Sequence, residues 1–192
     1  SKVLDSSSIP TSGWSAKITT ASDGAIYLVS NADSTASALD KINENGSRAW
    51  RLPFNELTNV DLYLSLNPLS TLSLFSGNAI KSDSAGGLFV AGSITDWYKG
   101  YGDRNFSRPK YSAIRKYDSS GDLEWSRDID KSGIGLANFS ADLDVYQEQY
   151  LYVAGVTAGD LHGQVNAGGD DIYLTKLSIE GDILWTNLIQ SS

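Results

Sequence analysis

The sequence lacks residue types on which many sites depend: among its 192 residues there is no cysteine, no methionine and one histidine. The absence of cysteine excludes a disulfide framework and any zinc site with thiolate ligands. His162 alone cannot build a zinc site without carboxylate ligands, and no nucleophile-elbow sequence accompanies it as a hydrolase triad would require. We therefore expect His162 to be an exposed loop residue.

Long apolar runs are also missing. No stretch approaches the roughly 20 apolar residues that span a bilayer, and the first residues lack the basic-then-apolar pattern of a signal peptide. We expect no membrane insertion.

Positive charge is scarce, since 15 Lys and Arg stand against 23 Asp and Glu and give a net charge of −8. Binding to phosphate backbones needs clustered Lys and Arg, so this balance argues against a nucleic-acid partner.

A ten-residue unit occurs three times. In each copy a glycine follows a lysine by five positions and a tryptophan follows that glycine by four. The copies are Lys41, Gly46 and Trp50; Lys116, Gly121 and Trp125; and Lys176, Gly181 and Trp185. We interpret the unit as a repeated hairpin, in which the tryptophan covers a neighbouring repeat and the lysine stem lies over apolar surface.

Each unit follows an aromatic and β-branched block that is typical of strands. The central aromatics of these blocks are Tyr27, Phe89 and Tyr152, spaced 62 and 63 residues apart. A short alternating segment precedes each block, as expected of a half-buried strand. Each repeat is thus predicted to hold four antiparallel strands.

The predicted fold class is all-β and propeller-like, with three four-stranded antiparallel blades in one domain over residues 1–192. The expected blades are approximately 13–56, 77–131 and 139–192, with an insertion over 57–76. Propellers typically have about four to eight blades, so three cannot close a ring. We expect either self-association of two chains into a closed ring or a longer parent chain. The segment 53–77 is expected to cover an otherwise open edge.

The third repeat resembles the SBBP-type β-propeller repeat family. The resemblance lies in a glycine-rich turn with aspartates at 168–171, an aromatic strand leading to Lys176, and the segment 150–157 that ends in Gly155, Val156 and Thr157. It matches the third repeat well, the second in part, and the first only in its Lys/Gly/Trp unit and aromatic strand. It implies a propeller fold and an extracellular or cell-surface location, and no catalytic residue.

The long connections fall between the second and third strands of a repeat or between repeats, so they collect on one face, which usually marks a binding face. The predicted loop 94–109 is rich in aromatic and charged residues, a mixture suited to stacking and hydrogen bonding. Its candidate ligand-binding residues are Trp97, Tyr98, Tyr101, Arg104, Phe106 and Arg108. The loop also fits a subunit contact or packing on itself. The leading hypothesis is a non-catalytic binding or assembly module for a glycan or protein, with no cofactor.

Acidic residues on the same face leave two alternatives open. A glycan-active hydrolase or lyase could use carboxylates as acid and base, the candidates being Asp96, Asp103, Asp160 and Asp170. Calcium could bind at Asp170 or Asp171, because hard cations accept oxygen-rich turns. The spacing of these residues does not match an EF-hand loop.

Overall fold

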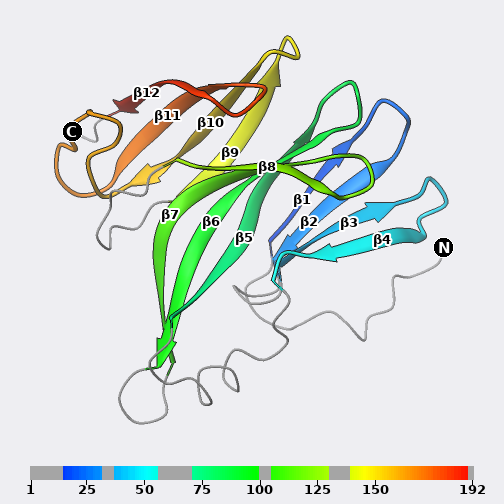
Figure 1. Cartoon of the computed structure of the whole chain (residues 1–192), viewed down its shortest axis with the longest axis horizontal. Helices are drawn as coiled ribbons and strands as arrows, with labels where there is room; N and C mark the ends of the chain where they lie inside the picture. Colours follow the sequence, from blue (N-terminus) through cyan, green and yellow to red (C-terminus); the bar gives the residue numbers. More distant parts are fainter. Residues whose placement is uncertain (1–14, 32–36, 56–70, 100–104, 130–138, 190–192) are drawn as a thin grey trace.

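The computed structural model describes residues 15–31, 37–55, 71–99, 105–129 and 139–189 (Figure 1). These ranges contain twelve strands that form three four-stranded antiparallel sheets. The prediction of an all-β, propeller-like fold is confirmed.

Each sheet, here called a blade, uses four consecutive strands in sequence order. Blade 1 consists of β1 (Ser15–Thr20), β2 (Ile26–Asn31), β3 (Ser37–Ile42) and β4 (Arg48–Pro53). Blade 2 consists of β5 (Thr71–Ser82), β6 (Leu88–Lys99), β7 (Asn105–Tyr117) and β8 (Leu123–Asp128). Blade 3 consists of β9 (Phe139–Tyr146), β10 (Tyr150–Thr157), β11 (Asp171–Ser178) and β12 (Ile183–Ile189).

The Lys/Gly/Trp unit forms the hairpin between the third and fourth strands of every blade. Its glycine needs the left-handed backbone region that side chains disfavour, with φ of +79° at Gly46, +96° at Gly121 and +91° at Gly181. A β-bulge follows the lysine in all three hairpins. In the second hairpin, the Ser120 hydroxyl donates to the Asp118 carboxylate and lowers its pKa, assisted by the backbone N–H of Asp122.

The middle blade is buried on both faces. Alternate residues of β6 point to opposite sides, so Leu88 and Val90 pack against blade 1 while Phe89 and Ala91 pack against blade 3. The first strands, β1, β5 and β9, lie beside one another in that order. Blades 1 and 3 therefore each have one blade neighbour within the chain, on opposite sides of blade 2 (Figure 1).

Three strands of blade 2 are longer than expected. The predicted loop over 94–109 is wrong for most of its length, because β6 continues to Lys99 and β7 begins at Asn105. β6 pairs on one side with an extended β5, which begins at Thr71, and on the other side with β7. The expected insertion over 57–76 is shortened in the same way, since residues 71–76 belong to β5.

Phe75 does not cover an open edge. It is buried between blades 1 and 2, where the Phe54 ring lies 5.1 Å away and the Asn55 side chain bonds the Phe75 backbone in both directions. Residues 56–70, the greater part of the segment predicted to cover that edge, lie outside the described ranges.

Candidate functional site

An arm of three strands extends blade 2 beyond the other blades (Figure 1). It comprises Thr71–Ser76 of β5, Ser93–Lys99 of β6 and Asn105–Tyr111 of β7, joined by antiparallel pairing with one register shift between Ile94 and Thr95. The arm lies at the end of the blades opposite the short hairpins, which is the end where the sequence predicted a binding face. Within the described residues it holds Asp96 and four of the six predicted ligand-binding residues.

The two faces of the arm differ in character. On one face, Trp97 packs against Leu72 and Leu74 in a small apolar cluster, and its buried indole N–H finds no acceptor among the described residues. On the other face, Tyr98 is 40% exposed. Because neighbouring residues of a strand point to opposite sides, Trp97 and Tyr98 cannot contribute to one binding surface.

The Tyr98 face also carries a charged group. The Asp96 carboxylate accepts a hydrogen bond from the Ser73 hydroxyl and forms an ion pair with Lys110 at 3.0 Å. Phe106 pairs with Tyr98 and Arg108 pairs with Asp96 in the strand register. Tyr101, Asp103 and Arg104 lie outside the described residues.

The connection between β10 and β11 is held by its own hydrogen bonds. The Asp160 carboxylate accepts from the Asn166 backbone N–H at 2.8 Å, and the Asn166 side-chain amide donates to the Thr157 carbonyl at 3.3 Å. The exposed His162 ring contacts the Thr186 hydroxyl through Nδ1 at 2.7 Å. Asp160 therefore orders its own loop.

The aspartates weighed for calcium are placed differently from each other. Asp171 is buried and accepts a hydrogen bond from the Ala167 backbone N–H, whereas Asp170 is exposed. In the part of the chain that the structure describes, no three His, Asp or Glu side chains are grouped so that they could hold a metal ion.

The carboxylates considered for hydrolysis come from separate blades. Asp96 lies on β6 and is ion-paired, while Asp160 and Asp170 lie within the β10–β11 connection of blade 3. These carboxylates therefore belong to two different blades.

Comparison with known proteins does not assign the chain to a family. The chain matches no protein-family model and no curated protein. A solved structure of a protein of unknown function from Bacteroides caccae is similar, with 11% identity, a TM-score of 0.31, and coverage of 93% of this chain and 83% of that chain. Over the described ranges, no helix has the length and hydropathy to cross a bilayer.

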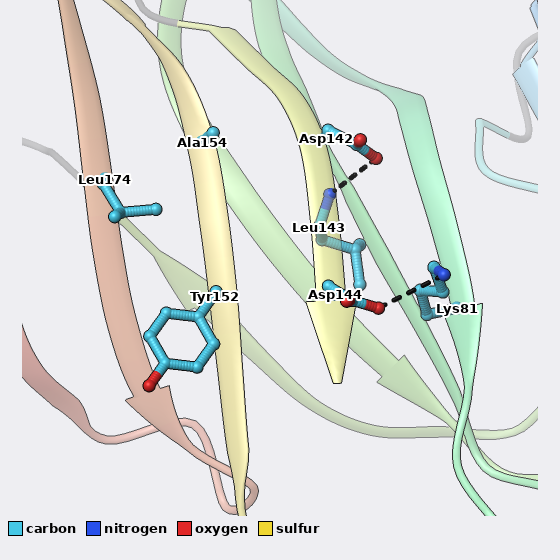
Figure 2. A pocket seen from close by; sticks show the side chains of 7 residues that line it. All are labelled: Lys81, Asp142, Leu143, Asp144, Tyr152, Ala154 and Leu174. Atoms are coloured by element: carbon cyan, nitrogen blue, oxygen red, sulfur yellow. Dashed lines mark hydrogen bonds and ion pairs between the residues drawn. The ribbon is translucent and has the colours of Figure 1, made fainter. Parts of the chain in front are cut away.

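A second surface was not predicted from the sequence. A hollow of about 260 Å³ lies on the side of blade 3 that faces away from blade 2, with Tyr152, Ala154 and Leu174 among its lining residues. Figure 2 shows these side chains together with Asp142 and Asp144 of β9, and with Lys81, whose ammonium lies 3.2 Å from the Asp144 carboxylate. The sequence signal that could have indicated this surface is the repeat, because Tyr152 occupies the position at which Tyr27 and Phe89 are buried by the following blade.

Blade 1 carries a buried carboxylate on its side facing away from blade 2. The Asp40 side chain is 4% exposed and lies 3.4 Å from Arg51 and 3.7 Å from Arg48. Burial raises the pKa of the Asp40 carboxyl above its ordinary value of 3.8, and the guanidinium groups of Arg51 and Arg48 oppose this rise.

We expect Arg51→Ala to lower the free energy of unfolding by about 1–2 kcal/mol near pH 7, less than for a fully buried pair because Arg51 is 38% exposed. A raised folded-state pKa means that the native chain binds the proton more tightly, so stability falls as pH rises from the ordinary value through the raised one. Without Arg51 the pKa of Asp40 should rise further. The stability lost by Arg51→Ala should therefore shrink below about pH 4, where Asp40 is protonated in both the folded and the unfolded chain. Urea unfolding across this range measures it.

Lys81→Ala is the control, because its partner Asp144 is 73% exposed and the pair should contribute at most about 1 kcal/mol. If Arg51→Ala lowered the free energy of unfolding equally at about pH 7 and below about pH 4, Arg51 would not stabilise the chain through the charge of Asp40.

Proposed function

We propose that the chain is a non-catalytic binding or assembly module that holds a glycan or protein ligand on the Tyr98 face of the arm. The observation that carries the proposal is the exposed Tyr98 ring beside the Asp96–Lys110 ion pair. An aromatic ring can stack on the apolar face of a sugar or side chain, and flanking charged groups can hydrogen-bond its polar edge.

The rigid setting of this face supports the proposal. The arm is paired on both sides of β6 and has its own apolar cluster under Trp97. Binding groups on paired strands lose less conformational freedom than groups on a flexible loop. We further propose an extracellular or cell-surface location, which rests on the resemblance of the third repeat to SBBP-type repeats.

The test uses a glycan array and a pull-down with the immobilised chain, followed by titration of the best ligand. Tyr98→Ala should raise the dissociation constant by about ten-fold or more, because loss of a central aromatic typically costs about 2 kcal/mol. Asp96→Asn should weaken binding through the lost charge. Tyr146→Ala is the matched control, since Tyr146 is 50% exposed on β9 but lies near the hairpin end.

Unchanged affinity in the Tyr98→Ala and Asp96→Asn chains would exclude this face as the site. Trp97→Ala is unsuitable as a first test because it removes the packing of Leu72 and Leu74 and can disturb the arm.

A further inference from the structure

Apolar residues at equivalent positions of the three blades differ in how far they are buried, and on blade 1 several of them are exposed. Its side facing away from blade 2, here called the leading face, carries Ile18, Ile26, Leu28 and Ile42. Ile18 is 65% exposed and the other three are partly exposed. The equivalent residues of blade 2 are Ile80, Leu88, Val90 and Tyr117, which are at most 5% exposed because blade 1 covers them.

The side of blade 3 that faces away from blade 2, here called the trailing face, also exposes apolar residues. It carries Tyr152, Ala154 and Leu174, which line the hollow in Figure 2, and Trp185, which lies on the same face of β12. Ile172 and Ile189 on the same face are 51% and 55% exposed. In blade 2 the positions of Tyr152, Ala154 and Leu174 are held by Phe89, Ala91 and Ile114, each 0% exposed under blade 3.

A tryptophan and a glycine form the contact between successive blades. A Cβ placed on Gly121 would lie 3.3 Å from the Trp50 ring, and one placed on Gly181 would lie 3.1 Å from the Trp125 ring. Each tryptophan thus lies on the glycine turn of the following blade. Trp185 is 38% exposed, and among the described residues no atom beyond the chain neighbours comes within 4 Å of a Cβ placed on Gly46. Trp185 thus lacks a following glycine turn, and the Gly46 turn lacks a preceding tryptophan, among the described residues.

The two open faces also carry opposite charges, Lys176 on blade 3 and Glu44 on blade 1, at positions that are in contact between blades 1 and 2. The Lys41 ammonium donates to the Ser119 carbonyl in the turn of the following blade, at 3.5 Å. Lys176 holds the position of Lys41, and Glu44 holds the position of Ser119, two residues before the turn glycine. A following blade that carried Glu44 would place a carboxylate opposite the Lys176 ammonium.

We propose that the trailing face of blade 3 binds the leading face of blade 1 in a second copy of this chain. Two such contacts, related by a two-fold axis, close a ring of six blades, a size within the usual range of about four to eight. Trp185 of each copy then lies on Gly46 of the other, and Ile18, Leu28 and Ile42 are covered as their equivalents in blades 2 and 3 are. The inference does not depend on ligand binding by the arm.

The test is the mass of the full chain in solution, measured by sedimentation and light scattering at concentrations up to about 100 µM. We expect twice the 20.7 kDa of one chain. Ile18→Asp on the leading face and Trp185→Asp on the trailing face should each raise the dimer dissociation constant by at least about ten-fold. Leu123→Asp is the control, because Leu123 is 54% exposed on blade 2 and lies on neither open face.

Mixing the two variants separates this arrangement from a face-to-same-face dimer. The trailing face of the Ile18→Asp chain and the leading face of the Trp185→Asp chain are both intact, so the mixture should form a heterodimer through one native contact. Energy transfer between labelled chains detects it, and circular dichroism with a cooperative urea transition verifies that each variant is folded.

A wild-type chain that stays at 20.7 kDa would overturn the proposal, as would dimers that persist in both variants or a mixture that forms no heterodimer. The outcome at the arm is independent, because Tyr98→Ala is read out by ligand affinity and should leave the dimer intact.

Discussion

Gly155→Ala should lower the free energy of unfolding by about 3–5 kcal/mol, one of the largest losses expected from a single methyl group in this chain. A Cβ at this position would lie 2.3 Å from the Phe139 carbonyl oxygen and 2.4 Å from the Tyr173 ring and hydroxyl. Backbone oxygen cannot move away without breaking the β9–β10 pairing, which already shifts register at Gly155.

The Tyr173 hydroxyl makes the collision more costly. It is buried, donates to the Ser112 hydroxyl at 2.9 Å and contacts the Ser140 hydroxyl at 3.1 Å, so it joins blade 3 to blade 2. Burial raises the pKa of Tyr173, and these two hydrogen bonds oppose the rise. If the ring moves to admit the methyl group, its hydroxyl loses these partners without regaining water.

Gly163→Ala is the control for Gly155→Ala. In the described part of the chain, no atom beyond the chain neighbours lies within 4 Å of a Cβ at Gly163. Its φ of +81° disfavours alanine, so we expect a loss of about 1–2 kcal/mol. Urea denaturation of both variants measures the difference. Equal losses would mean that β9 and Tyr173 adapt to the methyl group and that the close approach at Gly155 is not required.

The hairpins and strands were predictable because their determinants are local. The tight turn between the third and fourth strands needs a residue with positive φ at a fixed place in the hairpin, which favours glycine. The regular spacing of Gly46, Gly121 and Gly181 in the sequence therefore marks this turn in each blade. Alternation in segments such as Tyr150–Thr157 indicates a strand whichever blade it enters.

The arm could not be predicted in the same way, because its strands depend on partners far along the chain. The segment 94–109 contains glycine, proline and charged residues that are typical of a loop. It is mainly β-structure because Leu72 pairs with Trp97 and Leu74 pairs with Thr95. Without that register, Trp97 and Tyr98 appeared to belong to one surface, whereas the pairing places them on opposite faces.

The open faces also required the structure. The sequence shows that Trp50, Trp125 and Trp185 are equivalent, and equivalence alone predicts the same environment for all three. Their environments differ because, among the described residues, Trp50 and Trp125 are followed by another blade and Trp185 is not. A repeated residue therefore has a structural role where its neighbour is present and is available for association where its neighbour is absent.

The same substitution at two of these tryptophans should consequently lower stability by different amounts. Trp125→Ala should lower the free energy of unfolding by about 2–4 kcal/mol, somewhat less than a fully buried tryptophan, because the ring is partly buried between Phe89 and the Gly181 turn. Trp185→Ala should cost about 1–2 kcal/mol in dilute, monomeric chain, because Trp185 contacts the Tyr152 ring of its own blade at 6.1 Å but is 38% exposed and has no glycine turn packed on it among the described residues.

Concentration separates the two effects further. Association stabilises the folded chain by mass action, so the urea midpoint of the wild type should rise with chain concentration if Trp185 lies in a dimer contact. Trp185→Ala should abolish most of that rise, whereas Trp125→Ala should lower the midpoint at every concentration. Equal losses for both variants in dilute chain would show that the contact with Tyr152 in its own blade accounts for the whole contribution of Trp185, and the repeat would then explain stability without implying a partner.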